Sequence, residues 1–364
     1  MNKLMRLFSY ALITAVLFSA CDSDDDNKFS VNEEIEGCYI LNYGSFGKGG
    51  GSITRYNYSK DSLTLNYFQK QNGKQLASNI QYGALYKENI YLMGNEADGI
   101  ITLDKFFKPE INAAHKDIAK PRFFVGDDKY LYISCLGENP DWAEMPNTYI
   151  AKFNTERNSV EEKIELPGGP EGLAIANGKL YAALNYDTKV AVIDLEDHSI
   201  SYIETPAATS YFIKDENENL YVTLISTYSN PSDKAGLGYI NTSNNNDTLE
   251  TIYPLDGISS NYSAIASPNK DFSSIYVVAS SYDENWVQQG AVYNFDVASK
   301  KFTIFADDLT GVNGGVPNPD NDDVYILTSS STSTGGKIKI YNPDRTFVKD
   351  VTTGISPYWA IFLN

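Results

Sequence analysis

The stretch Leu180-Tyr181-Ala182-Ala183-Leu184, followed by Lys189-Val190-Ala191-Val192-Ile193-Asp194, contains the two features that decide the fold. An apolar residue precedes a tyrosine in a short run of strand-forming residues, and a second, alternating run ends at Asp or Asn. This pair of runs occurs seven times, with 40 to 55 residues between successive tyrosines. The tyrosines are Tyr39, Tyr91, Tyr132, Tyr181, Tyr221, Tyr276 and Tyr325. A repeat of this length with strand composition predicts an all-β, seven-bladed β-propeller.

A third apolar run precedes each tyrosine strand and supplies the innermost strand of a four-stranded unit. These runs often follow a Pro- or Ser-containing turn, as at Lys120-Pro121, Gly169-Pro170 and Ser356-Pro357. The first unit lacks such a run and the chain ends with one. We therefore expect residues 359–363 to complete the blade that residues 38–72 begin, which closes the ring and removes its sheet edges. The propeller is expected to occupy residues 37–364, with the repeated tyrosines packed between blades.

The N-terminal segment has the pattern of an export signal. Lys3 and Arg6 precede an apolar run from Leu7 to Ala20, which is too short to span a membrane. Phe18-Ser19-Ala20-Cys21 resembles the lipobox of bacterial lipoproteins. The resemblance implies removal of residues 1–20 and lipidation of Cys21; an ordinary secretory signal with a chance cysteine is the alternative.

Residues 21–36 are polar and acidic and are expected to form a tether. Asp22-Ser23-Asp24-Asp25-Asp26 resembles the signal that sends lipoproteins of Bacteroidota to the outer face of the outer membrane. A solvated acidic linker is the alternative interpretation, and both can hold. The expected location is thus the outer membrane, facing the cell exterior, with the lipid as anchor.

Composition and motifs exclude several functions. The formal net charge of −18 argues against nucleic acid and anionic membrane surfaces as partners. Cys38 and Cys135 fall in non-adjacent units and are expected to be free, buried thiols. The only histidines, His115 and His198, sit beside charged residues, and no catalytic or nucleotide-binding motif occurs. We therefore expect a monomer without enzymatic activity, bound metal or cofactor.

The first unit carries a family resemblance. Ile40-Leu41-Asn42-Tyr43-Gly44-Ser45-Phe46-Gly47, Gly49-Gly50-Gly51-Ser52-Ile53 and Phe68-Gln69-Lys70-Gln71-Asn72-Gly73-Lys74-Gln75-Leu76 resemble the opening of the YncE-like, YVTN-type propeller lipoproteins of Bacteroidota, the DUF5074 group. Tyr43 departs from that group, in which an acidic residue is common. The group includes BtuG-type surface proteins that capture vitamin B12 for a TonB-dependent transporter, and surface-layer proteins without a known ligand. The resemblance therefore implies ligand capture, with a corrinoid as the leading candidate.

The candidate site lies on one face of the predicted ring. Loops between the two middle strands of a unit, and segments that lead into innermost strands, share this face, and the long loops carry aromatic residues. Residues at the start of the innermost strands are expected to surround the channel mouth, including Asn313, and Asn42, Asn95 and Asn185 are expected to point amides there or to serve as turn formers. The proposed ligand contacts are Tyr43, Tyr82, Arg122, Trp142, Glu171, Tyr211, Tyr262, Trp286 and Tyr358. Aromatic rings with a few polar groups suit a large planar ligand, although 27 tyrosines place some there by chance.

Two other functions remain open at this point. Trp142 and Trp286 in exposed loops fit adhesion to a glycan or a protein equally well. A lactonase or lyase is the second alternative, because Glu171 with Asn185 and Asn313 resembles the channel metal site of six-bladed lactonases. Seven repeat units count against that analogy.

Overall fold

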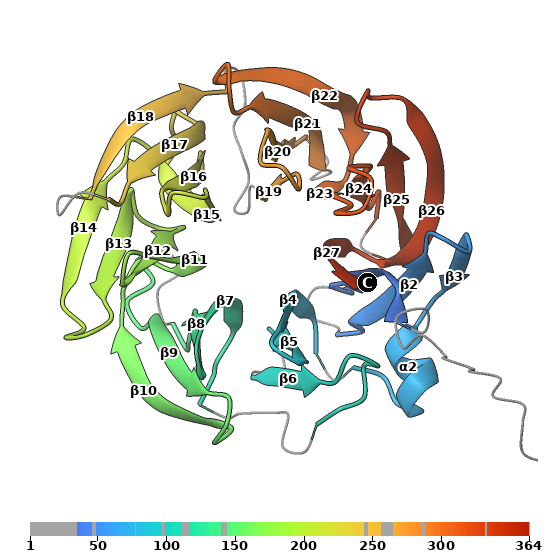
Figure 1. Ribbon diagram of the computed structural model, residues 1–364, viewed down its shortest axis with the longest axis horizontal. Helices are drawn as coiled ribbons and strands as arrows, with labels where there is room; N and C mark the ends of the chain where they lie inside the picture. Colours follow the sequence, from blue (N-terminus) through green and yellow to red (C-terminus); the bar gives the residue numbers. More distant parts are fainter. Residues whose placement is uncertain are drawn as a thin grey trace, which may run out of the picture. The chain divides into compact units, whose positions relative to one another are not determined.

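Seven antiparallel sheets surround a central axis in the computed structural model (Figure 1). The structure describes residues 35–45, 49–76, 78–95, 99–110, 117–139, 144–243, 247–255, 265–284, 288–331 and 333–363. Gly37–Leu363 form the propeller unit. The predicted all-β, seven-bladed propeller is confirmed.

Each blade contributes its innermost strand to the axis. Blade 1 consists of β27 (Pro357–Leu363), β1 (Gly37–Asn42), β2 (Ser52–Asn57) and β3 (Ser62–Thr64). Blade 2 consists of β4 (Ile80–Tyr86), β5 (Asn89–Gly94) and β6 (Ile100–Leu103). Blade 3 consists of β7 (Pro121–Asp127), β8 (Tyr130–Cys135), β9 (Tyr149–Asn154) and β10 (Ser159–Glu165). Blade 4 consists of β11 (Pro170–Ala176), β12 (Lys179–Leu184), β13 (Lys189–Asp194) and β14 (Ile200–Glu204).

The remaining three blades have the same order. Blade 5 consists of β15 (Ala208–Lys214), β16 (Leu220–Ile225), β17 (Gly236–Asn241) and β18 (Thr248–Pro254). Blade 6 consists of β19 (Ala266–Pro268), β20 (Ser274–Tyr282), β21 (Gln288–Asp296) and β22 (Lys301–Thr310). Blade 7 consists of β23 (Val312–Pro317), β24 (Val324–Thr328), β25 (Gly335–Tyr341) and β26 (Phe347–Ile355). A short helix, α2 (Tyr67–Asn72), lies between blades 1 and 2 in sequence.

The last strand closes the ring as the sequence predicts. β27 pairs with β1 in antiparallel register, with Cys38 opposite Phe362 and Ile40 opposite Ala360. This pairing joins the two ends of the propeller and covers the edge of β1, while β27 takes the innermost place in blade 1.

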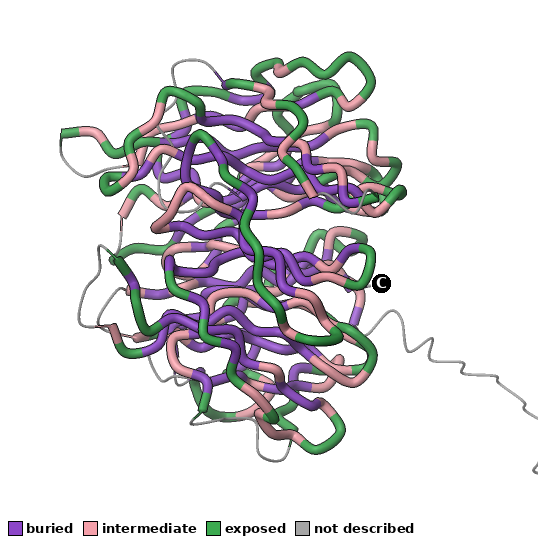
Figure 2. Tube along the Cα trace, turned by 90° about the vertical axis from the view of Figure 1, so that its left-hand side faces the viewer, coloured by how far each residue is buried: buried purple, intermediate pink, exposed green. Residues whose placement is uncertain are grey.

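The seven repeat tyrosines are packing residues. All lie in the second strand of a blade and none is more than 3% exposed. Their rings reach the following blade: Tyr91 contacts Phe124 of blade 3, and Tyr325 contacts Phe362 of blade 1, with ring centroids 5.9 and 5.4 Å apart. Figure 2 shows buried residues running through the stacked strands and exposed residues gathering in the outer turns. The expected inter-blade role of these tyrosines is confirmed.

Three strands of blade 2 lie among the described residues. After β6, Leu103 forms a bridge with Pro109, and the Glu110 N–H bonds to the Thr102 carbonyl at 2.9 Å. This run of described residues ends there, so it does not test the fourth strand that the sequence predicts for this blade. Residues 111–116, with His115, lie outside the described residues.

Two further sequence expectations concern the cysteines and the leader. Cys38 and Cys135 form no disulfide and are buried, and burial raises the pKa of the Cys38 thiol well above its usual range. Cys21 and the acidic tether lie outside the described residues. Within the described part of the chain, no helix has the length and apolar character needed to cross a membrane.

Burial of the seven repeat tyrosines, called the tyrosine ladder below, predicts loss of stability at alkaline pH. Burial is the main reason why the pKa of every ladder tyrosine is raised above 10, to about 12 for Tyr132. A raised pKa means that the folded state favours the neutral phenol. The stability that these tyrosines contribute is therefore complete below pH 10, and it is lost as the pH rises through their folded-state pKa values. Circular dichroism and tyrosinate absorbance, recorded together, should show ladder ionisation and unfolding in one transition.

A Tyr132→Phe variant provides the control for this titration. It removes one group that must ionise, so its alkaline midpoint should move to higher pH. Ionisation of all 27 tyrosines before any change in the circular dichroism would contradict the prediction.

Candidate functional site

The innermost strands share a distortion near their start. Register shifts interrupt the pairing of β4, β7, β11, β15, β23 and β27 with their second strands, at one or two residues each. The residues at these β-bulges are Gln81, Arg122 with Phe123, Glu171 with Gly172, Ser210 with Tyr211, Asn313, and Tyr358. A bulge redirects side chains that a regular strand would hold in alternation. Among these residues, Arg122 pairs with Glu171 and Phe123 contacts Tyr211 across different blades.

Hydroxyl groups of the second strands support two of these bulges. Ser134 Oγ accepts a hydrogen bond from the Phe123 N–H at 3.1 Å and donates to the carbonyl of Glu171 in the next blade at 2.6 Å. Thr223 Oγ1 accepts from the Tyr211 N–H at 2.8 Å. Backbone groups that the bulges remove from the ladder are thus satisfied, which allows these distortions to exist in a buried setting.

Four aromatic rings fill the axis between blades 1, 2, 3 and 5. Ring centroids lie 4.0 Å apart for Tyr82 and Phe123, and 5.7 Å apart for Phe123 and Tyr211. Tyr211 stacks on Trp359 at 6.2 Å, and Trp359 meets Tyr82 edge-on at 4.9 Å. These four residues, called the four-ring plug below, form a closed circuit of contacts. Through these rings the innermost strands of blades 1, 2, 3 and 5 contact one another across the axis.

An ion pair lies beside the plug. Arg122 donates from Nε and Nη2 to the two carboxylate oxygens of Glu171, at 2.7 and 2.9 Å. The side chains are 15% and 3% exposed. Burial alone would lower the pKa of Arg122, but the charge and hydrogen bonds of Glu171 outweigh it and raise the pKa above its usual range. Burial, followed by the neighbouring Tyr358 and Glu171, raises the pKa of Tyr211 well above its usual value.

Two tyrosines lie at the predicted channel mouth, Tyr43 directly after β1 and Tyr358 at the start of β27. The rings of Tyr43 and Tyr358 are 6.5 Å apart, and both residues are half-buried. The Tyr43 backbone N–H bonds to the carbonyl of Ser356 at 2.8 Å, which ties the two segments together. Asn95 Nδ2 donates to the Tyr43 hydroxyl at 3.3 Å, and Asn313 Nδ2 donates to the Pro357 carbonyl at 3.1 Å.

The structure therefore gathers six of the nine predicted contacts around the axis, namely Tyr43, Tyr82, Arg122, Glu171, Tyr211 and Tyr358. Trp142, Tyr262 and Trp286 lie outside the described residues. Phe123 and Trp359 are contacts that the sequence prediction missed. Each follows a predicted position directly, but the pattern reveals neither the bulge that contains Phe123 nor the ring contacts of Trp359.

The asparagines predicted beyond the repeat tyrosines have different roles. Asn42 is fully buried in blade 1, where its amide donates to the Ser52 carbonyl and to Thr54 Oγ1, both at 3.1 Å. Asn185 is also buried, and donates to Ser210 Oγ at 3.4 Å. Only Asn95, bound to the Tyr43 hydroxyl, directs its amide to the mouth as expected.

The resemblance to a lactonase metal site finds little support in this geometry. Both carboxylate oxygens of Glu171 already accept hydrogen bonds from Arg122. Within the described ranges, no group of three His, Cys, Asp or Glu side chains could hold a metal ion.

The ion pair predicts a strong asymmetry between single and double substitutions. Glu171→Leu should lower the free energy of unfolding by about 3–5 kcal/mol, because it leaves a buried guanidinium without its partner. The double variant Arg122→Met/Glu171→Leu should recover most of this loss, since both charges are then absent. Urea denaturation measures all three proteins. Lys214→Met, which breaks an exposed pair with Glu218, is the control and should change stability by less than about 1 kcal/mol. A double variant no more stable than Glu171→Leu would contradict the assignment.

Comparison with solved structures finds the same fold in proteins of diverse description. A quinonprotein alcohol dehydrogenase-like protein from Bacteroides thetaiotaomicron is 16% identical, with a TM-score of 0.66 over 91% of this chain and 79% of the other. The periplasmic gluconolactonase of Pseudomonas aeruginosa is 12% identical, with a TM-score of 0.65 over 90% and 99%. A putative 6-phosphogluconolactonase from Bacteroides fragilis is 11% identical, with a TM-score of 0.66 over 93% and 100%. No curated protein matches the sequence.

These neighbours correct one sequence expectation. The absence of recognisable catalytic motifs suggested a protein without enzymatic activity. Proteins described as gluconolactonases share the fold, so that deduction is wrong: a propeller of this kind does not exclude an enzyme.

The sequence also matches a family model along most of its length. The model, described as a domain of unknown function (DUF5074), covers residues 36–353. It spans all seven blades and ends within β26. The chain belongs to the DUF5074 family.

Proposed function

We propose that the chain captures a ligand with a broad flat surface at the channel mouth, and that a corrinoid is this ligand. The observation that carries the proposal is the pair of half-buried rings, Tyr43 and Tyr358, at the channel mouth. Aromatic side chains offer large, rigid apolar area at low entropic cost. A ligand with a broad flat face can cover both rings at once.

The charges at the channel mouth favour a ligand whose edge is uncharged. The charge of Arg122 is compensated by Glu171, so the mouth carries no free cation from this pair to select an anion. Arg122 is still partly exposed, and the neighbouring Asn95 and Asn313 add amides. Polar groups of this kind suit amide substituents around a macrocycle, since each can donate to or accept from them.

The proposed role also places the protein at the cell surface. The lipobox at Cys21 and the acidic run after it support anchoring at the outer membrane. Capture there would serve delivery of the ligand to a TonB-dependent transporter. Adhesion to a glycan or protein is the alternative role of the same face.

Isothermal titration with cyanocobalamin and cobinamide tests the proposal. The wild-type protein should release heat with both at micromolar concentration. Tyr43→Ala/Tyr358→Ala should weaken binding about tenfold, because two ring contacts are lost. Tyr228→Ala provides the control, since Tyr228 is 92% exposed and does not belong to the four-ring plug. Absence of heat and of a spectral shift at micromolar protein would refute corrinoid capture.

Lactone hydrolysis should be measured on the same samples. Base consumption with glucono-δ-lactone reports it directly. Turnover by the wild type that Glu171→Gln abolishes would assign the channel centre to catalysis and replace the binding proposal.

A further inference from the structure

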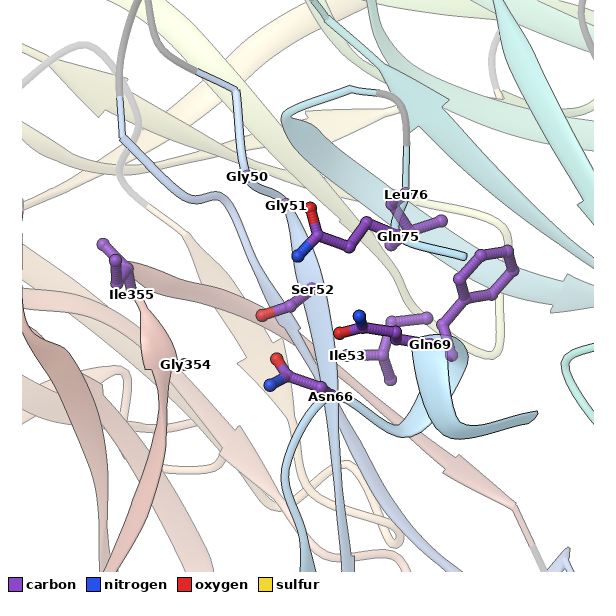
Figure 3. Close-up of a pocket in the computed structure, with 11 residues that line it drawn as sticks. Gly50, Gly51, Ser52, Ile53, Asn66, Gln69, Gln75, Leu76, Gly354 and Ile355 are labelled. Carbon is purple, nitrogen blue, oxygen red and sulfur yellow. The ribbon is translucent and has the colours of Figure 1, made fainter. Parts of the chain in front are cut away.

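A second concave site lies away from the axis, on the same face as the mouth. It is formed by the start of β2, by residues 66–76 around α2, and by the end of β26 (Figure 3). Its volume is about 150 Å³. This space, called the amide cleft below, is too small for a drug-sized ligand, which needs roughly 300 Å³ or more. It matches a single small ring.

Primary amides dominate the polar lining. Asn66, Gln69 and Gln75 contribute side-chain amides and Ser52 contributes a hydroxyl. In Figure 3 the amide ends of these three residues lie on the same side as the Ser52 hydroxyl. No hydrogen bond within the described structure uses these four side-chain groups, whereas the amides of Asn42, Asn72 and Asn79 are engaged in the protein. They are therefore available to a ligand.

The lining also has an apolar part on a fixed support. Phe68 and Leu76 are 4% and 6% exposed and line the cleft beside the amides. Asn72 Nδ2 donates to the carbonyls of Phe68 and Phe107, both at 2.9 Å, and the ring of Tyr67 meets Phe107 at 5.6 Å. These contacts hold α2 against the core, so Gln69 projects from a rigid element. Binding then requires little ordering of the protein backbone.

The chemistry of the lining selects the ligand class. None of the described residues that line the cleft is charged, so neither a phosphate nor an organic cation finds an opposite charge there. A purely apolar ligand would leave four polar groups desolvated without hydrogen bonds, which is costly. A sugar ring satisfies both parts, because its hydroxyls donate and accept while its C–H face covers apolar side chains. We propose that the amide cleft binds one ring of a neutral saccharide, a function separate from corrinoid capture at the mouth.

Saturation-transfer NMR and titration with glucose, galactose, mannose and N-acetylglucosamine test this site. Their methyl glycosides serve as a second arm, because they imitate the end of a glycan chain rather than a free sugar. At least one of these sugars should bind, with millimolar affinity. The variant Gln69→Ala/Gln75→Ala should bind it about tenfold or more weakly, since two neutral hydrogen-bonding groups are lost.

Two comparisons separate a binding role from a structural one. Lys70→Ala changes a neighbouring exposed residue of α2 that does not line the cleft, and it should bind sugar as the wild type does. The glutamine variant should keep the wild-type melting temperature and its response to cyanocobalamin, because its amides make no described hydrogen bond in the fold. No sugar binding, equal binding by the glutamine variant, or tighter binding of glucuronate than of glucose would each overturn the proposal.

Discussion

The pairing of β27 with β1 is the constraint on which the other features depend. It joins segments that are more than 300 residues apart in sequence and removes the only two strand edges that an open ring would expose at its ends. The same strand carries Tyr358 to the mouth and Trp359 into the four-ring plug. The strand before it, β26, supplies Gly354 and Ile355 to the amide cleft. The pairing that closes the ring therefore also positions residues of both candidate sites.

The ion pair at the axis does not follow from the needs of the fold. A buried salt bridge gains little over well-packed apolar residues, because both ions must lose their water. The neighbouring aromatic rings already fill this region with favourable contacts. Two bulges and a bridging hydroxyl, Ser134, nevertheless hold Arg122 and Glu171 in a bidentate geometry. The fold therefore positions two charged residues that add no stability over apolar ones. Such an arrangement is expected where a scaffold carries a functional site.

The periodicity of the sequence was sufficient to predict the fold, because each blade repeats the same pattern of apolar and turn-forming residues. Tyr39 and its six equivalents lie in the second strand of every blade, so one alignment of the repeats gives the ring order and the closing strand. The outer strand predicted for blade 2 would continue beyond the Pro109 bridge into residues outside the described ranges, so it stays a prediction. Arg122, Glu171 and Tyr211 were predicted from their place at the start of innermost strands. Phe123 and Trp359 were missed, because the sequence pattern shows neither the bulge that contains Phe123 nor the contacts that Trp359 makes with rings of blades 2 and 5.

The amide cleft was invisible in the sequence for a different reason. In the sequence, Asn66, Gln69 and Gln75 resemble any polar surface turn. They line a cleft only because the fold places them beside Ser52 of β2 and Ile355 of β26, which belong to two different blades. Both candidate sites nonetheless share a low net charge, which the acidic composition of the chain does not suggest. The chain has a formal net charge of −18, yet the mouth contains a compensated ion pair and the described lining of the cleft contains no charge. Glu171 is thus neutralised by Arg122, no acidic side chain is among the described residues that line the cleft, and a neutral ligand avoids the repulsion that an anion would meet on approach to the acidic chain.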